Sequence, residues 1–438
     1  MKRTTIFPIV TIGTEEADIR LKKIKSRNLT LDEKLISTVT KIVNTVRSDG
    51  DAALKRYTQE FDRVSLSQVR VSSDEIEKAR LNVSDHILSI ISEAAGNVRR
   101  FHERQKQNSW IVQDDDGTIL GQRVIPLESV ALYVPGGLAA YPSTVIMNAV
   151  PAQVAGVKHI CVVTPPNRNS TVNQLVLATC SLLGIDTVYS VGGAQGIAAV
   201  AYGTESVKRV DKIVGPGNIY VAAAKKIVYG DVDIDMIAGP SEVVVLADST
   251  CDAAQIAADL LAQAEHDQNA AAVLVTTDKR LARKVERKII SFLEQLSRKQ
   301  IALESVKRNA AAFIAPGMTE AIVLVNDIAP EHLEIMASGA WEILAQVKNA
   351  GAVFIGPYSP EPVGDYFAGP SHVLPTGGTA RFSSVLGVET FVKRSSVIHY
   401  SRRAFERDAA KIQIFAENEG LTAHALSIQI REKGGRKN

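Results

Sequence analysis

The sequence predicts an α/β protein built on parallel sheets. From residue 129 onward, short β-branched runs end in Gly, Pro or Asn, and each is followed by an Ala-rich helical stretch, as in βαβ units. The alternation resumes after the turn at Gly239-Pro240, which predicts a second α/β layer. The 438 residues, 45% hydrophobic and 22% charged, are sufficient to bury the cores of two such layers.

The first third of the chain is expected to be helical. Thr30 and Glu33 have the spacing of a capping box, and apolar residues recur at helical spacing from Ile36 to Val46. A second long helix is predicted from about Ser84 to Gln107, because its apolar residues form one stripe. Both helices are expected to serve packing rather than chemistry.

Two blocks of strands follow. The predicted strands are Ser129–Val134, His159–Val163, Thr187–Val191 and Lys212–Val214 in the first block, and Glu242–Leu246, Ala272–Thr276, Ala321–Val325 and Ala352–Ile355 in the second. Beyond Gly387 the alternation stops, which predicts a small, mostly helical C-terminal domain.

Composition excludes several classes of protein. The 50 basic and 48 acidic residues give a net charge of +2, which disfavours nucleic acid as a partner. The cysteines Cys161, Cys180 and Cys251 are odd in number and never closely paired, as expected in a reducing cytoplasm. No apolar run approaches the ~20 residues of a membrane span, and no secretory signal is recognisable.

Glycine-rich turns follow three of the predicted strands, at Tyr133–Gly137, Gly192–Gly196 and Gly215–Asn218. Ligands of open parallel sheets bind at the carboxyl ends of the strands, and such turns bring backbone N–H groups close to a phosphate. None matches the complete dinucleotide fingerprint, so a nucleotide site and plain tight turns both remain open.

A helix capped by Asp252 is expected to present Gln263 and His266, three residues apart, on one face at its C-terminal end. Imidazole and amide oxygen can bind a divalent metal. The other interpretation is a surface histidine at a frayed helix end.

Further candidates lie closer to the C-terminus. Pro330 is expected to open a helix whose positive end keeps His332 neutral and favours ionised Glu331, a general acid–base pair; a capping acid beside an incidental histidine is equally compatible. Asp365 lies in a proline-rich loop, as a metal ligand or a turn residue. Glu419 and His424 have no local feature that separates them from surface residues.

These segments closely resemble the histidinol dehydrogenase family over nearly the whole chain. The matching motifs occur in the family's order: ALYVPGGLAAYPSTVIMNAVPAQVAGV, SVGGAQGIAAVAYGT, IVGPGN, AGPSEVVVLAD, LLAQAEHD, APEHLE, VGDYFAGPSHVLPTGGTARFSS and AENEGLTAHA.

The resemblance implies two incomplete Rossmann-like parallel-sheet domains, small N-terminal and C-terminal helical domains, and an intertwined homodimer. The implied boundaries are 1–28 for an N-terminal arm, 29–130 with 243–386 for the first large domain, 131–242 for the second, and 387–438 for the C-terminal domain.

It also implies a cytoplasmic, zinc-dependent oxidation of L-histidinol to L-histidine through L-histidinal, with NAD as the oxidant. The implied zinc ligands are Gln263, His266, Asp365 and His424, the last reaching the partner subunit's site. Glu331 and His332 would be the catalytic pair. The substrate would contact Ser241, Glu419, His332 and the zinc ligands, and NAD would contact Tyr133, Gln195 and Asn218.

Three alternative functions remain open: the protein could oxidise another amino alcohol, act as a zinc hydrolase, or bind a metabolite without turnover. Within the oxidation, Cys251 beside a helix start is a weak candidate for a covalent aldehyde adduct. Ser371 departs from the resemblance, because relatives usually carry Asn there, and the shorter side chain could alter loop stiffness or substrate fit.

Overall fold

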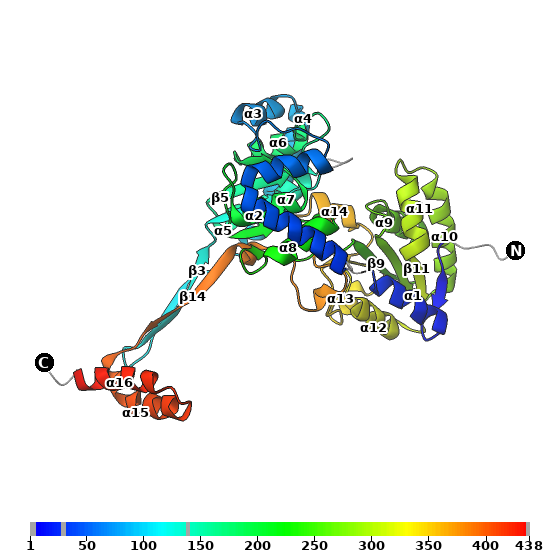
Figure 1. Ribbon diagram of the computed structural model, residues 1–438. Coiled ribbons are helices and arrows are strands. Elements are labelled where there is room, and N and C mark those ends of the chain that lie inside the picture. The colour runs from blue at the N-terminus through cyan, green and yellow to red at the C-terminus, as the bar shows by residue number, and fades with distance from the viewer. Residues whose placement is uncertain (1–5, 28–31, 137–140, 435–438) are drawn as a thin grey trace. The chain divides into compact units, whose positions relative to one another are not determined.

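The computed structural model describes residues 6–27, 32–136 and 141–434 (Figure 1). The chain forms two compact units, the first from Met1–Gln105 and Leu127–Phe391, and the second from Lys106–Pro126 and Val392–Asn438. Among the described residues, none of the helices has the length and apolar character required to cross a membrane.

The first unit contains a six-stranded parallel sheet with the order β1-β11-β10-β9-β12-β13. Its strands are β1 (Ile9–Thr11), β9 (Glu242–Ala247), β10 (Ala271–Thr276), β11 (Ala311–Ile314), β12 (His332–Ile335) and β13 (Ala352–Ile355). The associated helices are α1 (Glu15–Lys25), α9 (Ala253–Ala264), α10 (Lys279–Leu293), α11 (Lys299–Asn309), α12 (Met318–Ile328), α13 (Ala340–Leu344) and α14 (Glu361–Tyr366).

Apolar residues cover both faces of this sheet. Along β9, Val243 and Val245 join the core formed with α9, α10 and α11, whereas Val244 and Leu246 join the core formed with α1 and α12. Successive side chains of a strand point to opposite faces, so a strand buried on both sides is a continuous apolar run.

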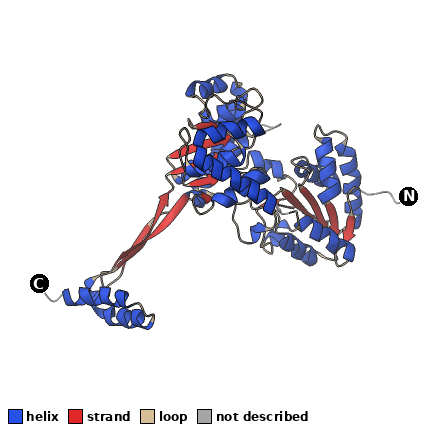
Figure 2. Cartoon of the chain, viewed as in Figure 1, coloured by secondary structure: helices blue, strands red, loops and turns tan. Residues whose placement is uncertain are grey.

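The first unit also contains a five-stranded parallel sheet with the order β6-β5-β4-β7-β8 (Figure 2). Its strands are β4 (Ser129–Tyr133), β5 (His159–Thr164), β6 (Val188–Ser190), β7 (Lys212–Val214) and β8 (Asp233–Ile234). The helices packed with it are α2 (Glu33–Phe61), α3 (Ser73–Leu81), α4 (Asp85–Glu103), α5 (Pro142–Ala155), α6 (Gln174–Leu182), α7 (Gly193–Tyr202) and α8 (Ile219–Val228). Two 3₁₀ turns, Thr379–Arg381 and Val388–Phe391, occur near the end of the unit.

The second unit is an antiparallel ribbon followed by a helical pair. The ribbon has the strand order β14-β3-β2, formed by β2 (Trp110–Gln113), β3 (Ile119–Pro126) and β14 (Val392–His399). The helices α15 (Arg402–Asn418) and α16 (Thr422–Gly434) pack against each other.

The α/β class and its parallel sheets are confirmed. Strands occur at seven of the eight predicted positions, with ends shifted by at most one residue. The helix predicted from about Ser84 is α4, and Ser84 caps it by accepting a hydrogen bond from the backbone of Ile87. Thr30 lies outside the described residues; the helix there begins at Glu33, with Asp32 as its cap.

Two predicted elements were wrong. Ala321–Val325 belongs to helix α12, where Val323 is 63% exposed while its neighbours are buried. Residues 330–334 do not open a helix, because His332–Ile335 forms strand β12 in the centre of the sheet. A short apolar run fits the period of a helix or of a strand. Hydrogen bonding to β9 and β13 is what makes residues 332–335 a strand.

The expected N-terminal and C-terminal pieces also differ from the structure. Strand β1 joins the six-stranded sheet, and β14 gives the C-terminal piece a strand that the prediction lacked. Helices α2 and α3 pack on the five-stranded sheet and α4 packs on its helix α5, whereas the expected boundaries group residues 29–130 with 243–386. The apolar stripe of a helix shows that it packs but does not identify its partner.

Candidate active site

Polar groups gather at the amino ends of β9 and β12. His332 opens β12 and pairs in register with Val243 on one side and Ala352 on the other. Leu333 and Ile335 point into the core shared with α12. By strand alternation, His332 and Glu334 point to the opposite face, where α9 and α14 lie.

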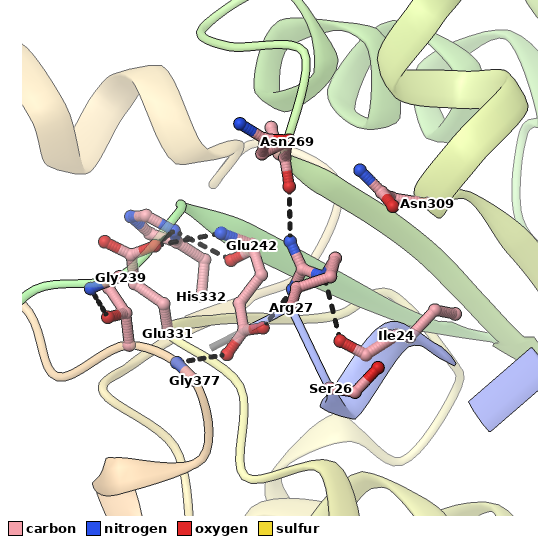
Figure 3. Close-up of polar contacts among 12 residues, drawn as sticks. Ile24, Ser26, Arg27, Gly239, Glu242, Asn269, Asn309, Glu331, His332 and Gly377 are labelled. Atoms are coloured by element: carbon pink, nitrogen blue, oxygen red, sulfur yellow. Dashed lines mark hydrogen bonds and ion pairs between the residues drawn. The ribbon is translucent and has the colours of Figure 1, made fainter. Parts of the chain in front are cut away.

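Figure 3 shows that the Glu331–His332 pair is held by the backbone of Glu242. The Glu242 N–H donates to Glu331 Oε2 at 2.9 Å, and the His332 ring atom Nδ1 lies 3.2 Å from the Glu242 carbonyl oxygen. A carbonyl only accepts, so in the tautomer that carries its proton on Nδ1 this nitrogen donates to Glu242 and Nε2 is left as the acceptor. His332 Nδ1 and Glu331 Oε2 are 3.8 Å apart.

Burial sets the electrostatics of this pair. It lowers the pKa of His332 to about 3 and raises the pKa of Glu331 well above its usual range. His332 is therefore neutral, as expected, but the cause is desolvation at a strand start and not a helix dipole. The expectation of an ionised Glu331 is wrong for the same reason, because burial favours its protonated form. Once this proton is lost, the carboxylate is a stronger base than an exposed glutamate.

A buried ion pair fixes Glu242 itself (Figure 3). Arg27 Nη2 lies 2.5 Å from Glu242 Oε2, and both side chains are less than a tenth exposed. Arg27 Nη1 also donates to the carbonyl of Asn269, and the backbone N–H of Gly377 donates to Glu242 Oε1. These contacts fix the start of β9, where the backbone of Glu242 bonds to Glu331 and His332.

A candidate metal centre lies beside His332. One ligand atom each from His266, Glu361 and Asp365 lies within 4.8 Å of the others. His332 Nε2 is buried, has no hydrogen-bond partner among the described residues and lies 4.0 Å from Asp365 Oδ1. Burial raises the pKa of Asp365 to about 7, as expected for a carboxylate that lacks a counter-charge.

Gln263 contacts this group from helix α9 and is fully buried. With its amide nitrogen turned inward, that nitrogen lies 3.2 Å from both the Glu242 carbonyl oxygen and Glu361 Oε2. His266 follows one residue after the Glu265 cap of α9 and is exposed. Because α9 runs back from the carboxyl end of β9, its C-terminal end reaches the amino edge of the sheet. Ser241, immediately before β9, lies at that same edge.

The sequence analysis missed two residues of this group, Glu361 and His372. Glu361 precedes Asp365 by four residues in the short helix α14, so both face one side. Asp365 was expected in a loop, and only its helical spacing from Glu361 could have indicated a second carboxylate. His372 Nδ1 lies 3.2 Å from the Asp365 carbonyl oxygen, and burial lowers its pKa to about 4.

A second layer of acids lies behind the candidate metal centre. The carboxyl groups of Glu334 on β12 and Asp259 on α9 lie next to each other, close enough for each to influence the pKa of the other. Burial raises the pKa of Asp259 to about 6 and that of Glu334 to about 8, so the pair retains a proton near neutral pH. Glu334 Oε1 accepts the backbone N–H of Glu361 at 2.8 Å.

The glycine turns lie at the carboxyl ends of the five-stranded sheet, as expected. Tyr133 ends β4, and its hydroxyl accepts the backbone N–H of Gly193 at 3.0 Å. Gly193 has φ +61°, and a Cβ there would lie 2.6 Å from Gln195 Oε1. Gln195 Oε1 is buried without a hydrogen-bond partner among the described residues. Asn218 caps α8 by accepting from Tyr220 and Val221.

A buried carboxylate near Tyr133 was not anticipated. Asp62 ends helix α2, and its Oδ2 is buried without a hydrogen-bond partner among the described residues. Burial raises the pKa of Asp62 to about 6, and its charge contributes to the raised pKa of Tyr133.

Glu419 and His424 belong to the second unit, and the other expected site residues to the first. Glu419 is the C-cap of α15, and His424 lies in the first turn of α16; both are exposed. Among the described residues of the first unit, the expected site residues that lie together are Gln263, His266, Glu331, His332 and Asp365.

Cys251 does not have the properties of a nucleophile. It follows β9 at the carboxyl edge of the six-stranded sheet, whereas His332 lies at the amino edge. Burial raises the pKa of its thiol, which donates to the Met336 carbonyl. Ser371 is buried and ties its own segment to helix α5: its hydroxyl donates to the Met147 carbonyl and accepts from the N–H of Val373.

Comparison with known proteins identifies the family. The model of the histidinol dehydrogenase family matches residues 25–432. The chain belongs to the histidinol dehydrogenase family. The members of this family are oxidoreductases.

The histidinol dehydrogenase of Halalkalibacterium halodurans is 54% identical over 395 residues, which cover 90% of this chain and 93% of the relative. That of Bacillus subtilis is 52% identical, with 92% and 94% covered. The crystal structure of histidinol dehydrogenase from Elizabethkingia anophelis superposes with a TM-score of 0.92 at 36% identity and covers 98% of this chain and 99% of that one.

Proposed function

We propose that the protein oxidises L-histidinol to L-histidine through L-histidinal, with zinc in the candidate metal centre and NAD as the electron acceptor in two successive steps. The observation that carries this proposal is the convergence of a neutral imidazole, His332, with the cluster of His266, Glu361 and Asp365. Membership of the histidinol dehydrogenase family supports L-histidinol as the substrate.

The donor set suits zinc. Imidazole nitrogen and carboxylate oxygen are ligands that zinc accepts, and a site with few protein ligands leaves room for substrate. The unpaired His332 Nε2 facing Asp365 supports a charged group at this place. We assign His266, Asp365 and Gln263 as ligands, with Glu361 adjacent. When bound, zinc would hold the amine and imidazole of the substrate and fix its carbinol carbon.

His332 Nε2 takes the hydroxyl proton of the alcohol as the carbinol carbon gives up a hydride. The proton has a ready acceptor because Nδ1–H is already committed to the Glu242 carbonyl. The aldehyde product stays bound. Glu331 then takes a proton from the water that adds to the aldehyde carbon, and the resulting hydrate loses its own hydride. A carboxylate that is buried against Glu242 N–H is suited to this second proton transfer.

The glycine turns of the five-stranded sheet suit a dinucleotide. The absence of a Cβ at Gly193 makes room for the side chain of Gln195, and buried Gln195 Oε1 and Asp62 Oδ2 are acceptors without partners among the described residues. We assign Tyr133, Gln195 and Asn218 to this site. NAD bound there would accept the hydride, while backbone N–H groups of the turns would face its phosphates.

We further propose that the protein acts as a homodimer in which Glu419 and His424 complete the site of the partner subunit. The ribbon of the second unit supports this, because it exposes large apolar side chains, with Trp110, Ile111 and Ile398 each more than half exposed. Apolar faces of this kind mark interaction surfaces. Glu419 and His424, exposed on the helical pair of the same unit, are available to a second copy.

The test is NADH formation from L-histidinol by purified enzyme, with and without a chelator. Two NADH per histidine formed, abolished by the chelator and restored by zinc, are expected. No NADH from a zinc-loaded sample would refute the proposal. Turnover of a different amino alcohol with none of L-histidinol would refute the substrate, and hydrolysis without NADH would indicate a zinc hydrolase.

Shared sites are tested with mixed dimers. His266→Ala and His424→Ala subunits should each be inactive alone and recover part of the activity when assembled together. Absence of recovery in verified heterodimers would contradict a site built from two subunits.

A further inference from the structure

The proposed mechanism does not use two acids, partly buried Asp259 and buried Glu334, although they lie directly behind the candidate metal centre. Each sits on an element that carries a site residue: Asp259 on α9, with Gln263, and Glu334 on β12, with His332. Two such acids without a basic partner are costly to a fold, so their presence calls for a role beyond packing.

The start of α14 needs an outside acceptor. Pro360 precedes Glu361 and Pro362 follows it, and the helix has no side-chain cap of its own. Because Pro362 lacks an N–H, the N–H of buried Glu361 is the one donor that this part of the first turn presents. Glu334 Oε1 accepts it at 2.8 Å and therefore fixes the start of α14 from the neighbouring strand.

The same carboxyl group is tied to α9. The Asp259 carboxyl lies next to that of Glu334, and Gln263 lies one helical turn after Asp259 on the same face. The Gln263 amide nitrogen in turn lies 3.2 Å from Glu361 Oε2, on α14. The two helices that supply the candidate ligands are thus joined through Glu334.

We propose that Glu334, held by Asp259, is a positioning residue that sets α9 and α14 in register, so that Gln263, His266 and Asp365 converge on the metal. The inference rests on the proposed zinc site, but its contacts do not depend on the metal. Outer groups that orient ligands typically change metal affinity by 10–100-fold when they are removed.

Three substitutions test the proposal in the full-length enzyme. Glu334→Leu removes the acceptor for α14, and Asp259→Ala removes the link to α9. Glu334→Gln keeps an acceptor oxygen for the Glu361 N–H and gives Asp259 a donor. Glu320→Leu, on the exposed surface of α12, is the matched control because it makes the same chemical change away from the site.

Zinc affinity is measured by competition with a chelating dye. Glu334→Leu and Asp259→Ala should weaken zinc binding by about 10–100-fold, while NAD binding stays within about twofold, because NAD is assigned to the other sheet. Glu334→Gln should retain zinc affinity within about threefold, and the control should match the parent.

The second readout is hydrogen exchange of the backbone at α14 in metal-free protein, which Glu334→Leu should accelerate and Glu334→Gln should not. Unchanged zinc affinity and exchange in folded Glu334→Leu would overturn the inference. A more than tenfold loss of zinc affinity in Glu334→Gln would also overturn the inference, since that variant keeps the acceptor oxygen. If Glu334→Leu does not fold, the zinc affinity of Glu334→Gln is the deciding measurement. Absence of zinc binding by the parent would refute the proposed function, whereas the exchange experiment would still test the positioning.

Discussion

The two parallel sheets of the first unit present their candidate sites at opposite edges. In the five-stranded sheet, the glycine turns follow the carboxyl ends of β4, β6 and β7, the edge at which open parallel sheets bind ligands. In the six-stranded sheet, His332 and Glu331 lie at the amino ends of β12 and β9, within a network of buried acids.

This difference separates two ways of building a site. A turn that binds through backbone N–H groups needs little more than glycine and an open sheet edge. A site that moves protons needs side chains in fixed positions, and the six-stranded sheet provides them by burying Glu242, Glu331 and His332 at strand starts. The first kind should tolerate changes in distant side chains, and the second should depend on its supporting contacts.

The largest effect is expected at the proton acceptor. His332→Ala should lower kcat by about 10²–10⁴-fold, because the hydroxyl proton loses its acceptor. NAD binding should stay unchanged, because His332 belongs to the other sheet. Steady-state kinetics and a separate NAD titration measure both quantities. A decrease in kcat below about threefold would contradict the assigned role.

A smaller loss is expected when one metal ligand is removed. His266→Ala should weaken zinc binding by at least 10-fold and leave the secondary structure intact, since His266 is exposed at the end of α9. Dye competition measures the affinity. His159→Ala, on the exposed start of β5, serves as the control and should retain the parent's affinity.

On the five-stranded sheet, Gly193→Ala should weaken NAD binding by about 10-fold, or ~1.4 kcal/mol. The added Cβ would meet Gln195 Oε1 at 2.6 Å in a left-handed conformation that alanine disfavours. Zinc affinity should be unaffected. Gly184→Ala, at a similar positive φ but with no atom near its Cβ, separates backbone strain from loss of the site. Equal loss in both variants would point to strain alone.

The smallest expected effect concerns Asp62. Its pKa is raised from 3.8 to about 6, so the folded state holds a proton that the unfolded state releases. Stability from this proton is complete below about pH 4 and is lost as the pH rises through 6. Asp62→Asn should not lose stability over this pH range. Relative to the parent, its free energy of unfolding should be higher at pH 8 than at pH 4 by about 1–2 kcal/mol, with the partial exposure of Asp62 taken into account.

Denaturant unfolding of both proteins at pH 4 and pH 8, without ligand, measures this difference. Glu60→Gln on the exposed face of α2 is the control and should follow the parent. If the difference in unfolding free energy between the parent and Asp62→Asn does not change with pH, Asp62 is ionised in the folded protein.

Much of the fold could be predicted from local patterns. β-branched runs bounded by Gly and Pro locate strands such as β4, β7 and β13, because buried parallel strands are continuous apolar runs. The prediction failed where a run was short and its period ambiguous, as in α12, and where ionisable residues occupy a strand, as in β12. His332 and Glu334 made β12 hard to predict, since ionisable residues are uncommon in a strand that is paired on both sides.

The candidate site was only partly accessible from sequence. Gln263 and His266 could be grouped by helical spacing, and His332 and Asp365 could be proposed one by one. Their convergence could not be predicted, because contacts such as that between His332 and Glu242 join residues 90 positions apart. Neither could the role of Glu334, whose partner is a backbone N–H of another element.

By itself the sequence determined the α/β class, most of the strands, the glycine turns and the identities of the chemical groups, because these depend on local periodicity and residue type. Only the tertiary structure decided which edge of each sheet is used, which helices cover which sheet, and which acids are buried. Those properties arise from long-range pairing and desolvation, and a pKa raised by burial, such as that of Glu331, exists only once the chain has excluded water around it.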